Sequence, residues 1–287
     1  MKTKQFLFTG MIGIALAGMV ITGCKKEPTA DTDATAAQDD ANASFALQDS
    51  KNISDGAAKG QATDRPFGAT CAQITKRDTV IGGSTDTLID IYFTGSCTSP
   101  DGRTRKGHIF VMWNGKGYFD SAASITETWK NYSFTPAWSS NTIGISGSRT
   151  LTNIGKDVSG DHSWTFSADL TLTYSTGGTA TWKSNRTNIL TKVGNIWYYV
   201  ITGGASGVSK SGNSYTLTIT SPLYYTAYWL NILNGNPYCD CFEAGTVELT
   251  RSTKKYPLFL NFTSGVGNCN HTATATINGN NYNITLP

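Results

Sequence analysis

The sequence lacks the common short motifs of enzymes. No Gly-x-Ser-x-Gly, His-Glu-x-x-His or phosphate-binding loop occurs in its 287 residues. These are the patterns by which many hydrolases, zinc peptidases and nucleotide-binding proteins are detected. The three histidines, at positions 108, 162 and 271, are far apart in the chain, and isolated histidines are more often structural than catalytic. We therefore expect a protein that is not an enzyme, and we assign no catalytic residue.

Charge is scarce as well. Asp, Glu, Lys and Arg make up 15% of the chain, and the formal net charge is +3. The basic residues form no stripe of the kind that nucleic-acid binding requires, so nucleic acid is not expected as a partner. Six cysteines are present, but the spacing in Cys239-Asp240-Cys241 is not that of zinc ligands. We expect no metal site and no cofactor.

The first 24 residues are organised like an export signal. Lys2 and Lys4 precede an apolar stretch from Phe6 to Ile21, and Gly23-Cys24 follows, which is the order of charged region, apolar region and cleavage site. A cysteine after a small residue matches the bacterial lipobox, so we predict that residues 1–23 are removed and that Cys24 is lipidated. The alternative is an uncleaved membrane anchor, since a bilayer needs about 20 apolar residues. The interspersed glycines and the final cysteine favour the lipoprotein.

Residues 24–66 differ in composition from the rest of the chain. Lys25 to Pro66 is rich in Ala, Asp, Thr, Gln and Ser, and Phe45 is its single aromatic residue. A segment of this kind buries too little apolar surface to offset its ordering entropy. We predict a disordered linker that tethers the next domain to the lipidated cysteine.

Residues 67–287 have the pattern of an all-β domain. This segment holds all seven Trp and all thirteen Tyr of the chain. From Ser163 to Tyr174 apolar and polar residues alternate strictly, which is typical of a strand with one buried face. Similar runs recur, and no segment beyond the signal shows a useful helical period. We predict an antiparallel meander or sandwich of roughly 10–13 strands, with Trp182 opposite Leu172 in the hairpin that follows Ser163–Tyr174.

Four cysteines bracket two predicted hairpins. Opposed residues of a hairpin have a constant sum of residue numbers, and the sums for Cys71 with Cys97 and for Cys241 with Cys269 place each pair about the centre of its turn. Disulfides form readily in exported proteins, and each of these would close a loop worth roughly 3–4 kcal/mol. Cys239 is an alternative partner for Cys269, and buried thiols are the alternative to any bridge.

The two ends of the domain resemble each other. After the second cysteine of each pair comes a strand-like run and then Asn-Gly, at Asn114-Gly115 and at Asn278-Gly279, and Asn-Gly is the strongest short signal for a two-residue hairpin turn. In the second copy such a turn places Ala275 opposite Tyr282 and Ala273 opposite Ile284. We interpret this as a pseudo-repeat of the cysteine hairpin at both termini of the domain.

Aromatic residues are the clearest lead to a binding surface. Adjacent aromatics on a strand point to opposite faces, so some rings of each cluster are expected to be exposed, where they suit stacking on sugars or packing on a protein. The alternative is that they fill packed layers of the core. The candidate binding aromatics are Trp129, Trp138, Trp197 and Trp229.

Several segments resemble uncharacterised Bacteroidetes-type lipoproteins. The resemblance covers nearly all of residues 67–287 and implies a β-rich domain on the outer membrane, facing the periplasm or displayed on the cell surface. Lys25-Lys26-Glu27 is a partial version of the charged stretch that directs surface export in some of that group. The family has no assigned activity. The segments that carry the resemblance are 97–107, 182–187, 201–203 and 269–279.

These observations lead to three functional hypotheses. The first is a membrane-anchored, non-catalytic domain that binds a glycan or a protein. The second is a structural or assembly component of the cell envelope. The third, ranked below both, is a polysaccharide hydrolase that uses dispersed carboxylates such as Asp120 and Glu127.

Overall fold

A computed structural model describes residues 33–58, 72–81, 84–99, 101–137, 139–156, 158–227, 231, 239, 241–262 and 271–285. The signal segment and Cys24 lie outside these residues, as do Cys71, Cys269, Trp138 and Trp229. The lipidation of Cys24 and the roles assigned to these other residues therefore stay predictions. In the described part of the chain, no helix is both long enough and apolar enough to span a membrane.

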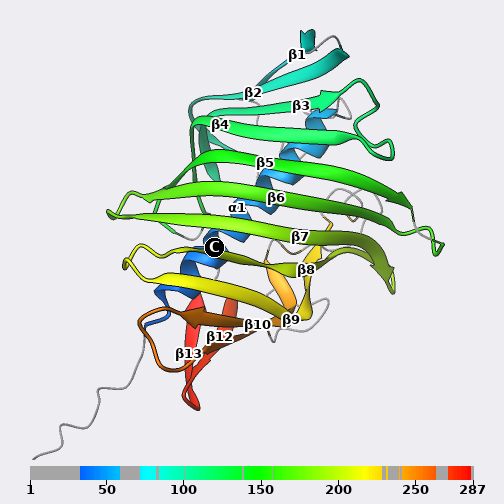
Figure 1. Ribbon diagram of the computed structural model, residues 1–287. Coiled ribbons are helices and arrows are strands. Elements are labelled where there is room, and N and C mark those ends of the chain that lie inside the picture. Colours follow the sequence, from blue (N-terminus) through cyan, green and yellow to red (C-terminus); the bar gives the residue numbers. More distant parts are fainter. Residues whose placement is uncertain are drawn as a thin grey trace, which may run out of the picture. The chain divides into compact units, whose positions relative to one another are not determined.

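The described residues form one sheet of thirteen strands and one helix (Figure 1). Every strand pairs antiparallel with the strands before and after it in sequence, which confirms the all-β prediction in its meander form. The strands are β1 Ala72–Ile81, β2 Ser84–Thr98, β3 Thr104–Asn114, β4 Ser124–Thr135, β5 Ile143–Lys156, β6 His162–Tyr174, β7 Thr179–Val193, β8 Ile196–Val208, β9 Ser214–Thr226, β10 Phe242–Arg251, β11 Leu258–Phe262, β12 Thr272–Ile277 and β13 Asn280–Thr285.

Strict alternation correctly located the central strand. In β6 the apolar residues from Trp164 to Tyr174 are buried on one face, and the Ser and Thr residues between them are mostly exposed on the other. The hairpin to β7 turns through Ser175–Gly178, and Trp182 lies opposite Leu170, not opposite Leu172 as predicted. The partner of Trp182 is thus two residues away from the predicted one, and because this shift is even, Trp182 stays on the predicted face of the sheet.

The two Asn-Gly turns behave differently. Asn278 and Gly279 both have positive φ, at 48° and 79°, and Ala275 pairs with Tyr282 as predicted. Asn114-Gly115 makes no such hairpin, because β4 begins only at Ser124 and the Asn114 side chain instead accepts a hydrogen bond from the Ser124 backbone N–H at 3.0 Å. The pseudo-repeat therefore does not extend to this turn.

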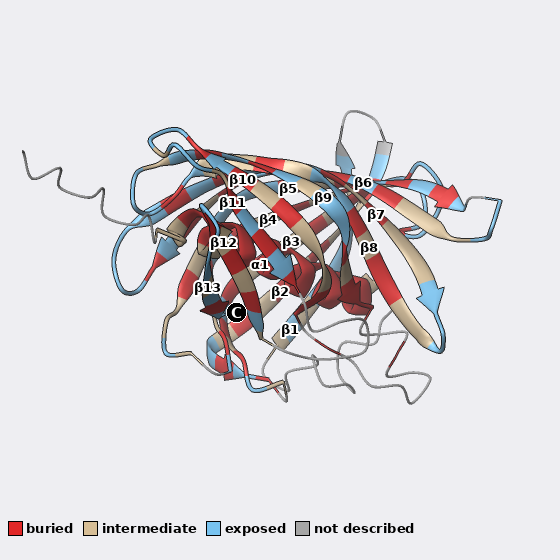
Figure 2. Cartoon of the chain, turned by 90° about the horizontal axis from the view of Figure 1, so that it is seen from below, coloured by how far each residue is buried: buried red, intermediate tan, exposed pale blue. Residues whose placement is uncertain are grey.

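The linker prediction was wrong for residues 35–58. These residues form helix α1, Thr35–Ala58, and every residue from Ala36 to Ala57 except Gln38 is buried. Figure 2 shows the sheet arching over α1, so that the concave face of the sheet and the helix enclose the core between them. Phe45 of the helix packs on Phe134 of β4, with ring centroids 5.6 Å apart.

The register of the terminal hairpins corrects the cysteine argument. The residue numbers of each β1–β2 pair add up to 165, as for Ala72 with Phe93, whereas Cys71 with Cys97 needs 168. The predicted six-residue loop is a two-residue link, which moves the centre of the hairpin. In the β10–β11 hairpin the sum is 507, whereas Cys241 with Cys269 needs 510. The register argument for both pairs is therefore wrong by three positions.

The state of the described cysteines favours a different pairing at the C-terminal end. No two of Cys97, Cys239 and Cys241 lie at disulfide distance from one another, and the Sγ atoms of Cys239 and Cys241 are 2.9 Å apart. Cys97 and Cys239 are each in the disulfide-bonded state, and Cys241 is not. Cys239, the alternative partner of Cys269, is therefore the cysteine that we predict to be oxidised; Cys269 lies outside the described residues.

Candidate functional site

The concave face of the sheet carries buried arginines that point toward α1. A buried charge is costly unless an opposite charge and hydrogen bonds compensate for it. Each of these arginines contacts a residue of the segment 33–58. They come from β3 and the residue before it, from β5, from β7 and from β10, and they are Arg103, Arg105, Arg149, Arg186 and Arg251.

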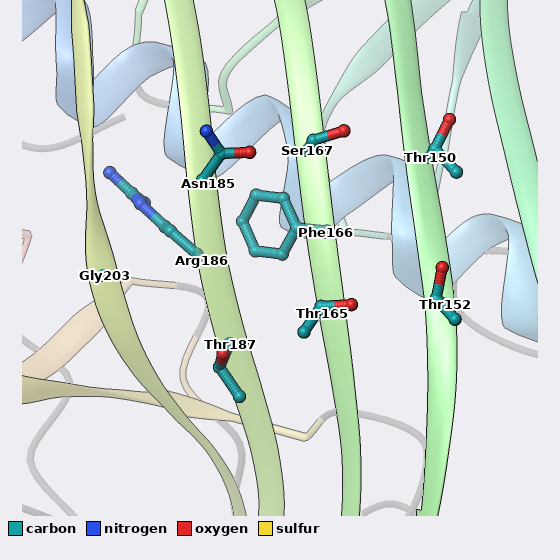
Figure 3. Close-up of a pocket in the computed structure, with 9 residues that line it drawn as sticks. All are labelled: Thr150, Thr152, Thr165, Phe166, Ser167, Asn185, Arg186, Thr187 and Gly203. Atoms are coloured by element: carbon teal, nitrogen blue, oxygen red, sulfur yellow. The ribbon is translucent and has the colours of Figure 1, made fainter. Parts of the chain in front are cut away.

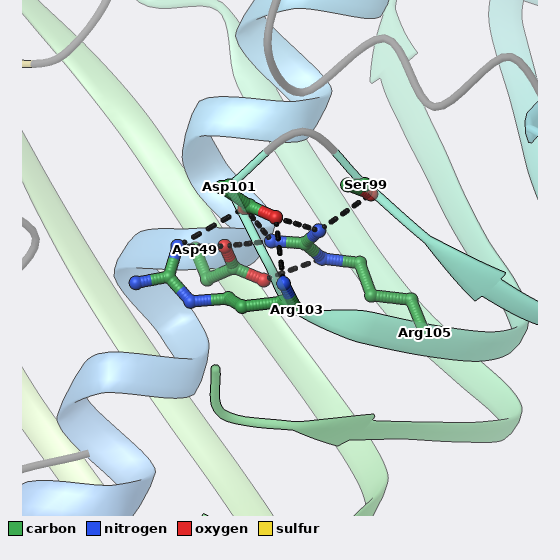
Figure 4. A network of polar contacts seen from close by, with 5 residues as sticks. All are labelled: Asp49, Ser99, Asp101, Arg103 and Arg105. Atoms are coloured by element: carbon green, nitrogen blue, oxygen red, sulfur yellow. Dashed lines mark hydrogen bonds and ion pairs between the residues drawn. The ribbon is translucent and has the colours of Figure 1, made fainter. Parts of the chain in front are cut away.

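The central part of the helix contacts a four-residue ionic cluster through Asp49 (Figure 4). Asp49 of α1 accepts two hydrogen bonds from Arg105, from Nη2 at 2.6 Å and from Nε at 3.1 Å, and a longer one from Arg103 at 3.4 Å. Asp101 lies on the other side of both guanidinium groups, 2.7 Å from Nη2 of Arg105. Burial raises the pKa of Asp101, but Arg105 and Arg103 outweigh this effect and hold the pKa below its usual value.

The middle of the helix meets an ion pair of the sheet. Glu127 of β4 pairs with Arg149 of β5, and the two residues face each other in the ladder. Arg149 also donates to the backbone oxygen of Leu47 at 2.7 Å, and Ser50 donates to Glu127 at 2.9 Å. One backbone carbonyl and one side-chain hydroxyl of the helix are thereby connected to this ion pair of the sheet.

The same region corrects the prediction for Trp129. Its indole N–H donates to Ser50 at 3.3 Å, and the side chain is buried against the helix. Trp129 is therefore a core residue, since the helix covers the face on which it lies. Trp197 of β8 is half-buried; its backbone N–H donates to Asn231, and the ammonium of Lys192 lies 5.9 Å from its ring centroid.

The N-terminal half of α1 is bound by β6 and β7. The Trp182 indole donates to Asp40 at 2.6 Å, and Arg186 donates to Ser44 at 2.8 Å. The Tyr174 hydroxyl donates to Asp39 at 2.6 Å. The positions that pair with Arg149 across the next three strands all carry small residues. These are Ala168 of β6, Ser184 of β7 and Ala205 of β8. Such a row leaves room for a helix to approach the sheet.

The C-terminal half of α1 contains the one cation of the segment 33–58. Lys51 pairs with Asp55 at 2.5 Å, and its ammonium lies 4.9 Å from the ring of Tyr199. Burial lowers the pKa of Lys51, but Asp55 and Tyr199 raise it above the usual value. Burial and the Asp55 carboxylate in turn raise the pKa of Tyr199 to about 12, so Lys51 carries the charge at neutral pH.

Charge complementarity explains why a polar segment folds into the core. Residues 33–58 contain five aspartates and one lysine, and the concave face opposes them with its five arginines. The sequence of residues 24–66 predicts disorder because it buries few apolar groups. The prediction failed because the arginines that contact Asp40 and Asp49 lie more than 50 positions away in the chain, where no local pattern reveals them.

The outer face of β2 and β3 carries an exposed aromatic strip. We define the strip as Tyr92, His108 and Phe110, all of which are half-buried. The Tyr92 and His108 rings stack with centroids 4.2 Å apart, and His108 stacks on Phe110 at 5.5 Å. Asp90 lies 2.9 Å from Nδ1 of His108 and fixes the orientation of the imidazole.

Apolar and polar side chains extend this strip. Leu88 pairs with Met112 next to Phe110, and both are half-buried. The neighbouring strands β1 and β4 contribute the polar border at the same level of the ladder. Its members are Gln73, Thr75, Arg77, Thr126, Thr128 and Lys130. The strip is not evident from His108 as an isolated histidine in the sequence. It becomes evident only when the register of the β2–β3 hairpin places His108 opposite Tyr92.

A hollow of about 370 Å³ lies on the outer face of β5–β8 (Figure 3). Its lining is rich in hydroxyl and amide groups, from Thr150, Thr152, Thr165, Ser167, Asn185 and Thr187. Gly203, at a bulge of the β8–β9 ladder, and the buried residues Phe166 and Arg186 complete the lining. Most of the lining side chains are neutral hydrogen-bonding groups, and Arg186 is the charged residue among them. Within the described residues, no cluster of three or more metal-ligating side chains occurs.

Comparisons with known proteins give no relative. No protein-family model, no curated protein and no solved structure matches this chain.

Proposed function

We propose that this chain is a lipid-anchored lipoprotein of the bacterial outer membrane whose β domain binds a glycan without catalysing a reaction. The observation that carries the proposal is the aromatic strip on the outer face of β2 and β3. Flat rings that stay partly exposed stack well on the apolar faces of sugar rings. The border of hydroxyl, amide and charged groups supplies the hydrogen bonds that orient a sugar.

The geometry of the strip suits a ligand longer than one sugar. Tyr92, His108 and Phe110 continue one another as a row of stacked rings across two paired strands. The Asp90–His108 hydrogen bond holds the middle ring in place, which lowers the entropy lost on binding. The hydroxyl-lined hollow on β5–β8 is a second surface with the neutral groups that sugars accept.

The anchoring part of the proposal rests on the export signal and Cys24. A single lipid chain binds membranes only marginally, so stable anchoring needs more than one chain. Cells that express the protein with Cys24→Ser should release it from the membrane fraction and should no longer incorporate labelled palmitate into it. Retention of label in this variant would contradict the lipoprotein assignment.

The hydrolase hypothesis loses one of its carboxylates in this fold. Glu127 is fully buried and paired with Arg149 beneath the helix, so it does not reach a substrate on the surface. No feature of the described residues favours a structural role in the cell envelope over glycan binding.

A glycan array probed with residues 25–287 tests the binding proposal. We expect retention of at least one class of oligosaccharide, reduced about tenfold or more by Tyr92→Ala and by Phe110→Ala. The matched control is Phe259→Ala, which removes a ring that is 46% exposed on β11 and should leave binding unchanged. Absence of binding across the array, or equal binding by all three variants, would overturn the proposal.

A further inference from the structure

Helix α1 has little tendency to form on its own. Seven of its 24 residues are Ala, but ten are Asp, Asn, Ser or Gly, which are poor helix formers because they hydrogen-bond to the backbone or lack a side chain. Isolated helices of such composition are unstable in water. The helix therefore depends on the concave face of the sheet, and every contact described above between them involves a side chain.

Polar atoms in the interface between α1 and the sheet are incompletely satisfied. On the sheet, Nε of Arg149, Nε of Arg186, Oε1 of Glu127 and Oδ1 of Asn188 are buried and make no hydrogen bond. On the helix, the same holds for Nε2 of Gln48 and Oγ of Ser54. A buried polar atom without a hydrogen bond destabilises the contact in which it lies. Six such atoms therefore lie between α1 and the sheet without a direct protein partner.

The charges of the interface are also suited to exchange. A buried ion pair contributes little net stability, because the loss of hydration of both groups offsets their attraction. The arginine groups need a carboxylate, but nothing in their geometry restricts it to one chain. Arg105 binds Asp49 through two parallel hydrogen bonds, which is the general mode of carboxylate recognition by arginine.

From these observations we propose that the concave face is a binding groove for an acidic helical segment of a partner protein, and that α1 is its displaceable intramolecular occupant. In the occupied state, Asp49 fills the Arg103–Arg105 subsite and Asp40 fills the Trp182–Arg186 subsite. The two carboxylates are nine residues apart, which is about 13.5 Å along a helix. A partner segment would carry carboxylates at this spacing, separated by small residues.

This arrangement makes the closed state autoinhibitory. Displacing α1 costs free energy. The apparent affinity of a partner is therefore its intrinsic affinity multiplied by the fraction of molecules in which the groove is open. A substitution that loosens α1 raises that fraction and strengthens partner binding without a new contact. This site is separate from the aromatic strip, since the strip lies on the opposite face of the sheet.

A labelled peptide of residues 33–58 serves as the probe, titrated by fluorescence anisotropy onto the chain 25–287. We expect the Asp49→Asn chain to bind the peptide at least tenfold more tightly than the unaltered chain, because its own helix is held less firmly. The double variant Asp49→Asn/Arg105→Gln should lose this gain, and so should a peptide carrying Asp49→Asn. Binding that is equal in all combinations, or absent from a folded Asp49→Asn chain, would overturn the proposal.

Hydrogen exchange of the unaltered chain provides a second measurement that requires no variant. A displaceable helix opens while the sheet stays folded, so amides of α1 should exchange at least tenfold faster than those of β6. Exchange of α1 and β6 at the same protected rate would show that the helix leaves only on global unfolding, and this result would also overturn the proposal.

Discussion

Asp49 and Arg105 form a buried, two-pronged ion pair between the helix and the third strand. Oδ1 of Asp49 lies 2.6 Å from Nη2 of Arg105 and Oδ2 lies 3.1 Å from Nε, with both side chains excluded from solvent. The pair joins positions 56 residues apart, so it is formed only when the sheet and α1 have come together. A substitution in this pair therefore changes the free energy with which α1 is held against the sheet.

Removing one partner of this pair should weaken the fold. Asp49→Ala leaves Arg105 buried without the carboxylate that accepts its two parallel hydrogen bonds, and removing one partner of a buried ion pair costs about 3–5 kcal/mol. Urea unfolding followed by tryptophan fluorescence measures the effect. The control is Asp169→Ala, which breaks the exposed Lys183–Asp169 pair and should cost less than about 1 kcal/mol. Equal losses in the two variants would show that the buried cluster has no special role.

Acid should destabilise the protein through Asp101. Its pKa is held below the usual value of 3.8, so its ionised form is favoured in the folded state. The resulting stability is fully present above pH 3.8 and is lost as the pH falls through the folded-state pKa. Asp101→Asn should therefore be less stable than the unaltered chain at pH 7, and the difference should shrink as the pH falls through the folded-state pKa of Asp101. Unfolding curves recorded between pH 2 and 7 would refute this if the difference stayed constant.

Local signals in the sequence were sufficient for much of the sheet but not for the site. β6 and the β12–β13 turn were predicted because alternation and Asn-Gly chemistry are determined within a few residues. Helix α1 was missed, since the arginines that neutralise its aspartates come from distant strands. Trp129 was misassigned for the same reason: its strand has two faces, and only the position of α1 decides which one is covered.

Gly203 should be intolerant of a side chain. Its φ is 109°, and a Cβ there would lie 2.4 Å from the backbone oxygen of Asn185 on the neighbouring strand. Gly203→Ala should cost about 2–3 kcal/mol, because strain of the backbone and a clash add together. Gly212→Ala is the matched control, with φ at 83° and open space around the Cβ position; it should cost about 1 kcal/mol. Thermal unfolding of both variants distinguishes clash from backbone strain alone.

We predict that Cys71 is joined to Cys97 and Cys239 to Cys269, and that Cys241 keeps its thiol. Non-reducing peptide mapping should recover these two bridges, and a thiol-specific label applied after denaturation should modify Cys241. Reduction should cost roughly 2–5 kcal/mol of stability for each bridge. Cys241→Ser should leave both bridges in place, whereas Cys239→Ser should remove the second one. Recovery of a Cys241–Cys269 peptide from the unaltered chain would contradict this pairing, because Cys239 would then be the residue that keeps its thiol.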